Sequence, residues 1–140
     1  MAHNVSEVMA TDPVRLAPTA SLQEAARQMR DADVGDVIVI EESDRLRGIV
    51  TDRDIAIRAV ADGLDPSSTS VGDICSSQLV TLAPNDTLDA AARRMREADV
   101  RRLPVVQDDR VVGVVSIGDL AIERDSDSAL ADISAAKGNQ

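Results

Sequence analysis

The chain has 140 residues, with 15 Lys or Arg against 25 Asp or Glu, and its formal net charge is −10. Hydrophobic residues make up 44% of the sequence, enough for a packed core in one compact domain or two small ones. The acidic balance disfavours nucleic acids and anionic membrane surfaces, and Phe, Tyr and Trp, on which single-stranded bases stack, are absent. We therefore predict no nucleic-acid partner and no membrane partner.

Cysteine and histidine each occur once, as Cys75 and His3. One cysteine excludes an intramolecular disulfide and a multi-cysteine metal site. A Ser-His-Asp triad or a histidine metal site would depend on His3, close to the N-terminus. The sequence therefore predicts neither an enzyme nor a metal protein. Without a secretory pattern or a long apolar run, we expect a cytoplasmic location.

The sequence repeats itself. Residues 14–34 (VRLAPTASLQEAARQMRDADV) align with residues 80–100 (VTLAPNDTLDAAARRMREADV), and residues 45–57 align with residues 110–122. About two-fifths of the paired positions are identical. The repeat predicts two copies of one unit. The expected divisions are unit 1 at 5–63, a linker at 64–70, unit 2 at 71–124, and a C-terminal tail or short helix at 125–140.

Each copy is predicted as β-α-β-β-α. Apolar residues at helical spacing begin at Leu22 and Leu88, and near-continuous apolar runs at 37–41 and 103–107 are typical of strands buried on both faces. In chain order the first copy has a lead-in at 5–9, strands at 14–17, 37–41 and 45–51, and a second helix at 52–62 capped by Gly63. The second copy has a lead-in at 71–75, strands at 80–83, 103–107 and 110–116, and a second helix at 117–124.

One motif occurs at the same place in both copies. It reads Gly-apolar-apolar-Thr/Ser-x-x-Asp, at Gly48–Asp54 and Gly113–Asp119. In one interpretation it is a helix capping box, with Thr51 or Ser116 at the cap. In the other, the hydroxyl and the helix N–H groups donate hydrogen bonds to a phosphate oxygen, and the Asp accepts two hydrogen bonds from a ribose diol. The two interpretations are compatible.

The unit resembles the CBS domain, and two in tandem resemble a Bateman module. The resemblance rests on ADVGDVIVI and ADVRRLPVV before a hairpin and on GIVTDRD and GVVSIGD after it, and it covers about residues 5–124. It implies an α+β fold in which two units with pseudo-two-fold symmetry form two central clefts. Such clefts bind adenosine-containing ligands, namely AMP, ADP, ATP or S-adenosylmethionine. The chain is similar to small stand-alone bacterial CBS-pair proteins and is expected to act as a non-enzymatic sensor.

The resemblance also implies the residues of each cleft. One cleft would use Ser116 and Asp119, with Ala20, Val34, Gly35 and Asp36 around the base and Val114 behind it. The other would use Thr51 and Asp54, with Val100 and Arg101 near the base and Ile49 behind it. A basic residue often precedes the second strand in this family and faces the phosphates. Arg102 holds that position in unit 2, but Asp36 holds it in unit 1, which predicts that the Ser116/Asp119 cleft is the tighter nucleotide site.

A homodimer is also expected, because apolar stripes repeat on the first helix of each copy, at Leu22/Ala26/Met29 and Leu88/Ala92/Met95. A regulated partner protein is a further expectation of the sensor hypothesis. The alternative hypothesis is a structural or interaction dimer with vestigial clefts, in which the motif serves only as a helix cap.

Overall fold

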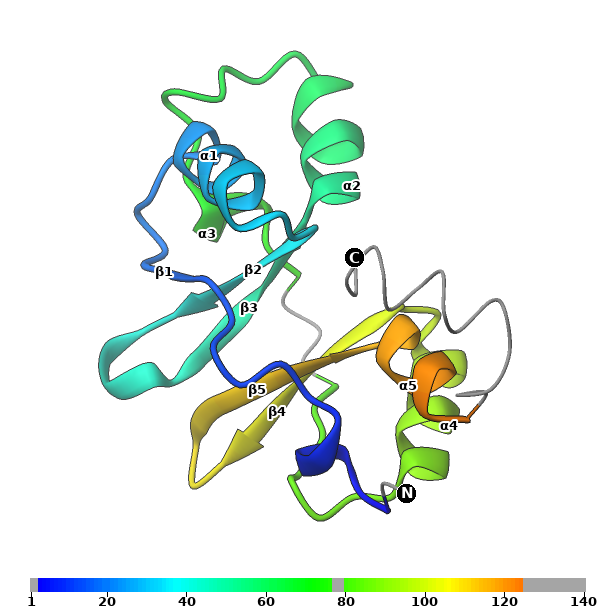
Figure 1. Cartoon of the computed structure of the whole chain (residues 1–140). Coiled ribbons are helices and arrows are strands. Elements are labelled where there is room, and N and C mark those ends of the chain that lie inside the picture. The colour runs from blue at the N-terminus through cyan, green and yellow to red at the C-terminus, as the bar shows by residue number, and fades with distance from the viewer. Residues whose placement is uncertain (1–2, 77–79, 125–140) are drawn as a thin grey trace. The chain divides into compact units, whose positions relative to one another are not determined.

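The computed structural model describes residues 3–76 and 80–124 (Figure 1). The chain forms two compact units. One consists of residues 13–79, and we refer to it as the first-repeat unit. The other joins the N-terminal segment up to Asp12 to the residues from Val80 onward, and we refer to it as the second-repeat unit.

The first-repeat unit is a three-stranded sheet with helices packed on it. Its elements are β1 (Arg15–Leu16), α1 (Leu22–Ala32), β2 (Asp36–Ile40), a 3-10 turn η2 (Glu42–Asp44), β3 (Leu46–Thr51), α2 (Asp52–Asp54), a π-helical stretch η3 (Ile55–Val60), and α3 (Val71–Ile74). The strand order is β1-β2-β3, with β1 parallel and β3 antiparallel to β2. The central strand β2 is covered on both faces, as its apolar run predicts, since Val37, Ile38 and Val39 are all fully buried.

Capping residues explain where α1 begins and where it ends. Ser21 caps its start, where the side chain accepts a hydrogen bond from the Glu24 N–H at 3.0 Å. Asp33 ends it in the left-handed conformation, with φ of 55°. Between these caps Leu22 and Met29 are buried in the core of the unit together with Val37 and other residues of β2 and β3.

The second-repeat unit repeats this plan. Its elements are a 3-10 turn η1 (Val5–Glu7), α4 (Leu88–Ala98), β4 (Arg102–Gln107), β5 (Arg110–Ser116) and α5 (Ile117–Arg124). Strands β4 and β5 form an antiparallel hairpin. Thr87 caps α4 and Asp99 ends it with φ of 55°, which matches the ends of α1.

The lead-in segments are exchanged between the repeats. Val5 is fully buried in the core of the second-repeat unit, and the Ala10 backbone makes two hydrogen bonds with Val114 of β5. In the same way Val71 is fully buried in the core of the first-repeat unit, and the Ser76 N–H donates to the Ile49 carbonyl of β3 at 3.0 Å. Each repeat therefore supplies a segment to the core that the other repeat builds.

The stretch expected as a linker, 64–70, makes ordered contacts within the first-repeat unit. The Leu22 N–H donates to the Thr69 carbonyl at 2.9 Å, and the Gln23 N–H donates to the Pro66 carbonyl at 3.1 Å. These bonds satisfy amide groups at the start of α1, which no helical carbonyl can reach.

Two predicted elements were wrong in extent. The strand expected at 80–83 is a single bridge, in which Leu82 pairs with Val105. The second helix of the first copy is not one α-helix over 52–62, because it widens into π-helical hydrogen bonding at Ile55–Val60. Gly63 follows with φ of +73°, the left-handed conformation that suits the predicted glycine cap.

Most residues of the stripes that predicted a dimer are not exposed, although Ala26 is. Leu22, Met29 and Met95 are at most 7% exposed and lie in the cores of their own units, and Leu88 and Ala92 pack against the second core. Among the described residues, the large hydrophobics that are exposed are Ile57, Val60, Leu64, Val100 and Ile117. The expected tail at 125–140 lies outside the described residues. Within the described ranges, no helix has the length and apolar character needed to cross a membrane.

Candidate functional site

The first motif lies where β3 runs directly into α2. The Asp54 N–H donates to Thr51 Oγ1 at 3.0 Å, and the Thr51 N–H donates to Asp54 Oδ2 at 2.9 Å. This is a complete capping box, as the sequence spacing predicts. Asp36 is the cross-strand partner of Thr51 on β2, and Asp52 begins the helix. We refer to Asp36, Thr51, Asp52 and Asp54 as the Thr51 corner.

The second motif has the same geometry where β5 runs into α5. The Asp119 N–H donates to Ser116 Oγ at 3.1 Å, and the Ser116 N–H donates to Asp119 Oδ2 at 2.8 Å. Both residues are more deeply buried than their counterparts, with exposures of 5% and 6%. Arg102 is the cross-strand partner of Ser116 on β4. We refer to Arg102, Ser116, Ile117 and Asp119 as the Ser116 corner.

The other predicted site residues are described here within the unit to which each belongs. In the first-repeat unit the Gly35 carbonyl accepts from the Asp52 N–H at 2.9 Å, which ties the α1–β2 turn with Val34 to the Thr51 corner. Ile49 lies two positions before Thr51 on β3, so its side chain shares a sheet face with the hydroxyl. Ala20 precedes α1, and its carbonyl accepts from the Val71 N–H.

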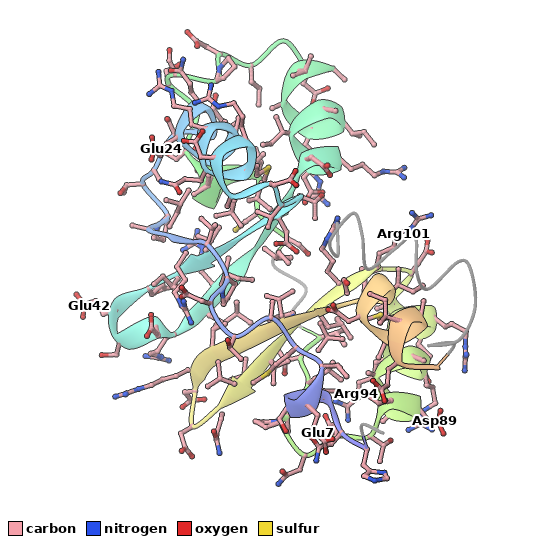
Figure 2. All side chains as sticks on the ribbon, in the orientation of Figure 1. Glu7, Glu24, Glu42, Asp89, Arg94 and Arg101 are labelled. Carbon is pink, nitrogen blue, oxygen red and sulfur yellow. The ribbon has the colours of Figure 1, made fainter. Side chains whose placement is uncertain are left out.

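In the second-repeat unit the Arg101 carbonyl accepts from the Ile117 N–H at 2.8 Å, and Arg101 itself is exposed (Figure 2). Val100 precedes it and is also exposed. Val114 lies two positions before Ser116 on β5, as Ile49 does before Thr51. The structure thus assembles one half of each expected site inside each unit. The pairings across the repeats that the resemblance implies stay predictions.

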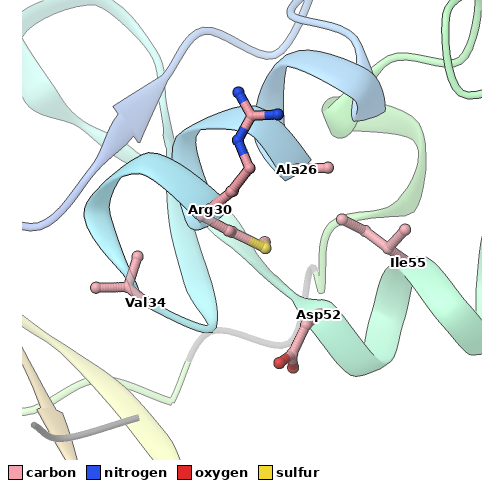
Figure 3. A pocket seen from close by; sticks show the side chains of 6 residues that line it. Ala26, Arg30, Val34, Asp52 and Ile55 are labelled. Atoms are coloured by element: carbon pink, nitrogen blue, oxygen red, sulfur yellow. The ribbon is translucent and has the colours of Figure 1, made fainter.

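A hollow of about 320 Å³ adjoins the Thr51 corner. Figure 3 shows Ala26 and Arg30 on α1, Val34 in the turn between α1 and β2, Asp52 at the start of α2 and Ile55 at the start of η3. The hollow is lined by Ala26, Met29, Arg30, Val34, Asp52 and Ile55. Of these residues, only Val34 was expected near a ligand from the sequence.

Sequence reasoning noted that Asp36 and Arg102 distinguish the two corners, but it missed two further differences between them. Ile117 is 53% exposed at the first position of α5, where the first repeat has the charged, exposed Asp52. Arg58 lies one turn beyond Asp54, with its Nε 3.9 Å from Asp54 Oδ1, and Glu123 holds the equivalent position beyond Asp119. Aligning the two copies position by position would have revealed both differences.

The described residues contain no group of three or more His, Cys, Asp or Glu that could hold a metal ion. The hydroxyl and the carboxylate of each corner offer hydrogen bonds. A hydroxyl both donates and accepts, and a carboxylate has two oxygens that accept several hydrogen bonds. Each corner uses one oxygen of its carboxylate, Oδ2, for the capping box. Such a pair suits a ligand with vicinal hydroxyl groups.

Removing either hydroxyl will weaken the fold. We expect Thr51→Ala and Ser116→Ala each to lower the free energy of unfolding by about 1 kcal/mol, because each leaves a helix-start N–H without its acceptor. Denaturant melts of the ligand-free variants measure this. The conservative changes Thr51→Ser and Ser116→Thr keep the acceptor and serve as controls. Unchanged midpoints in both alanine variants would show that the hydroxyls do not act as caps.

Comparison with known proteins identifies the family. The CBS-domain profile matches residues 5–60 and 71–125, nearly the whole described chain. The chain therefore belongs to the CBS family and carries a pair of CBS domains, a class of regulatory module. Among its relatives is the CBS domain-containing protein YhcV of Bacillus subtilis, which is 39% identical over 135 residues, covering 94% of this chain and 95% of the relative.

Two solved structures bear on the site. The hypoxic response protein I structure, which holds two coordinated zinc ions, is 32% identical with a TM-score of 0.78, and the match covers 84% of this chain and 96% of that one. The CBS domain pair of MJ0100, solved with 5′-methylthioadenosine and S-adenosyl-L-methionine, is 25% identical with a TM-score of 0.81, covering 89% and 98%.

Proposed function

We propose that the protein is a non-enzymatic sensor that binds an adenosine-containing ligand at the Thr51 and Ser116 corners. The ligand class comprises AMP, ADP, ATP, S-adenosylmethionine and related adenosine compounds. In each corner the carboxylate accepts hydrogen bonds from the ribose diol, and the hydroxyl at the helix start contacts the phosphate or its substitute. Aliphatic residues behind the hydroxyl, Ile49 and Val114, support the purine, because the chain has no aromatic side chain to stack on it.

The observation that carries this proposal is the duplication of one hydrogen-bonded constellation at two strand-to-helix junctions. Both copies keep a hydroxyl and a carboxylate joined by two hydrogen bonds of 2.8 to 3.1 Å. The CBS pair of MJ0100 supports the ligand class, because both of the compounds bound to that protein contain adenosine.

A thermal-unfolding scan of the full chain tests the proposal. A ligand present at about 100 times its Kd stabilises the folded state by about 2.7 kcal/mol, which raises the midpoint by several degrees. We expect such a shift from at least one of adenosine, AMP, ATP, S-adenosylmethionine and 5′-methylthioadenosine. Guanosine and ribose 5-phosphate serve as matched controls for the base and the phosphate. No shift with any adenosine compound would contradict the proposal.

One observation favours a second function, a structural or interaction protein with vestigial sites. Each capping box already occupies the hydroxyl and one carboxylate oxygen with backbone partners, so the residues have a structural reason to be there. In that case the adenosine compounds leave the midpoint unchanged, while the alanine variants at Thr51 and Ser116 still lose stability.

We also propose that the protein forms a homodimer through the exposed apolar face of the helix after β3. Ile57, Val60 and Leu64 are 50%, 63% and 40% exposed. Ile57 and Val60 lie on the π-helical stretch, and Leu64 follows the turn at Gly63. We expect sedimentation at micromolar concentration to give twice the chain mass of 14.8 kDa. The variant Val60→Asp should shift the protein to monomer, whereas Ala56→Asp on the same stretch should shift it less. A parent mass near 14.8 kDa would contradict the dimer.

A further inference from the structure

The hollow beside the Thr51 corner has an apolar floor with one charge of each sign at its edge. Met29 is buried and Ile55 is half-buried, so this floor is partly shielded from water. Arg30 and Asp52 are exposed, and Figure 3 shows their charged groups on opposite sides of the hollow. The volume of about 320 Å³ is at the lower end of the range for small-molecule sites, ~300–1,000 Å³. The hollow therefore suits a short, partly apolar group that carries both charges.

Both charged side chains keep hydrogen-bonding capacity that the fold does not use. Arg30 Nε lies 3.0 Å from Asp31 Oδ1, in an ion pair whose side chains are 73% and 66% exposed. An ion pair this exposed contributes little to stability, so it does not hold the guanidinium tightly. Asp52 Oδ1 accepts from the Arg53 N–H at 2.8 Å. Within the part of the chain that the structure describes, this leaves the terminal nitrogens of Arg30 and Oδ2 of Asp52 for a ligand.

The second repeat provides an internal comparison for the hollow. Five of the six lining residues have a counterpart of the same character, at Ala92, Met95, Arg96, Val100 and Leu120. Only the acidic position changes, because Ile117 stands where the first repeat has Asp52, and its side chain is 53% exposed. A pair of opposite charges at this place is therefore a property of the first repeat alone.

Asp52 joins the hollow to the site proposed for the ligand. It directly follows Thr51, whose hydroxyl is proposed to contact the phosphate of a nucleotide or the group in its place. It also lines the hollow, and its N–H donates to the Gly35 carbonyl at 2.9 Å, which fixes it beside the turn between α1 and β2. With the ribose and hydroxyl contacts proposed above, a substituent on the ribose 5′ carbon extends past Asp52 into the hollow.

We propose that the hollow binds the amino acid tail of an adenosine ligand, as carried on the sulfur of S-adenosylmethionine and S-adenosylhomocysteine. The carboxylate of the tail pairs with the Arg30 guanidinium, and its ammonium group pairs with Asp52. The methylene groups of the tail lie against Met29 and Ile55, where they leave water. This inference rests on the proposed function and selects, from its ligand class, the sulfur-linked amino acid conjugates for the Thr51 corner.

Isothermal titration of the full chain with S-adenosylhomocysteine and 5′-methylthioadenosine tests the inference. Both probes contain adenosine and an uncharged thioether sulfur, and they differ in the amino acid tail. We expect the parent to bind S-adenosylhomocysteine about tenfold more tightly, because the tail adds charge-assisted hydrogen bonds. In Arg30→Met, which removes the charge but keeps a long apolar chain, this advantage should disappear while the affinity for 5′-methylthioadenosine stays nearly unchanged. Asp52→Asn, which keeps the size of the side chain, should also lower the ratio of the two affinities.

Arg96→Met is the matched control, since Arg96 holds the position of Arg30 on α4 of the second repeat. It should leave the ratio unchanged. Equal binding of both probes by the parent, an unchanged ratio in Arg30→Met or in Asp52→Asn, or an equal fall in Arg96→Met overturns the inference while adenosine binding stands. Binding of AMP or ATP without either probe overturns the inference alone. Absence of binding to all four compounds overturns the proposed function and the inference with it.

Discussion

The variant Gly48→Ala will unfold at much lower denaturant concentration than the parent. A Cβ atom at position 48 would overlap the carbonyl oxygen of Ser76 and lie 2.9 Å from the sulfur of Cys75. That segment is held against β3 by the bond from the Ser76 N–H to the Ile49 carbonyl, so it cannot move without losing a ladder contact. We expect a loss of about 2–3 kcal/mol in the free energy of unfolding, typical of overpacking.

Two other glycines calibrate this result. In Gly113→Ala the new Cβ would lie 2.6 Å from the sulfur of Met9 and 2.8 Å from the backbone oxygen of Ala10. The Met9 side chain is flexible and can move away, so we expect a smaller loss of stability than at Gly48. In Gly63→Ala nothing lies within 4 Å, and the cost of about 1 kcal/mol comes from the left-handed backbone alone. Equal unfolding midpoints for Gly48→Ala and Gly63→Ala would show that Cys75 and Ser76 do not pack closely against Gly48 of β3.

The largest expected effect on binding is that of Asp119→Ala. This variant removes the acceptor proposed for the ribose diol, and a hydrogen bond to a charged group contributes roughly 1.5–3 kcal/mol, so the tightest ATP-binding event should weaken by ~10-fold or more. Isothermal titration measures the change. The deep burial of Asp119, at 6% exposure, adds to its effect, because water cannot replace the lost acceptor easily.

Asp54→Ala is the matched control for Asp119→Ala. It removes the same half of a capping box, so both variants lose a similar amount of stability. The control should leave the tightest ATP-binding event nearly intact, because Asp54 belongs to the corner that faces Asp36. Equal losses of ATP affinity in the two variants would refute the inequality of the corners, and no loss in either would refute the role of the carboxylates.

The local features of the fold followed from the sequence. The Thr/Ser-x-x-Asp spacing predicted both capping boxes, because the hydrogen bonds join residues only three positions apart. The apolar run of β2 predicted a strand buried on both faces, which the full burial of Val37, Ile38 and Val39 confirms. The family resemblance is also confirmed by the profile match over both repeats.

The features that the sequence missed depend on contacts between distant segments. A repeat shows which segments are alike but not which core each one joins, so the exchange of Val5 and Val71 could not be predicted from it. The apolar stripe of α1 was assigned to a dimer interface, because periodicity shows that a helix has an apolar face but not what that face packs against. In the structure Leu22 and Met29 pack in the core of their own unit. Similarly, the π-helical hydrogen bonding at Ile55–Val60 has no signature in the local residue types.

We expect an adenosine ligand to bind where each strand of the two motifs enters its helix. Amide hydrogen exchange of the full chain, measured with and without saturating ATP or S-adenosylmethionine, tests it most directly. We expect the ligands to slow exchange in the peptides that contain Gly48–Asp54 or Gly113–Asp119, with ATP acting most strongly on the second, while the β2–β3 turn around Glu42 stays unchanged. Exchange that is unaltered at both motifs with either ligand at saturation would contradict the account.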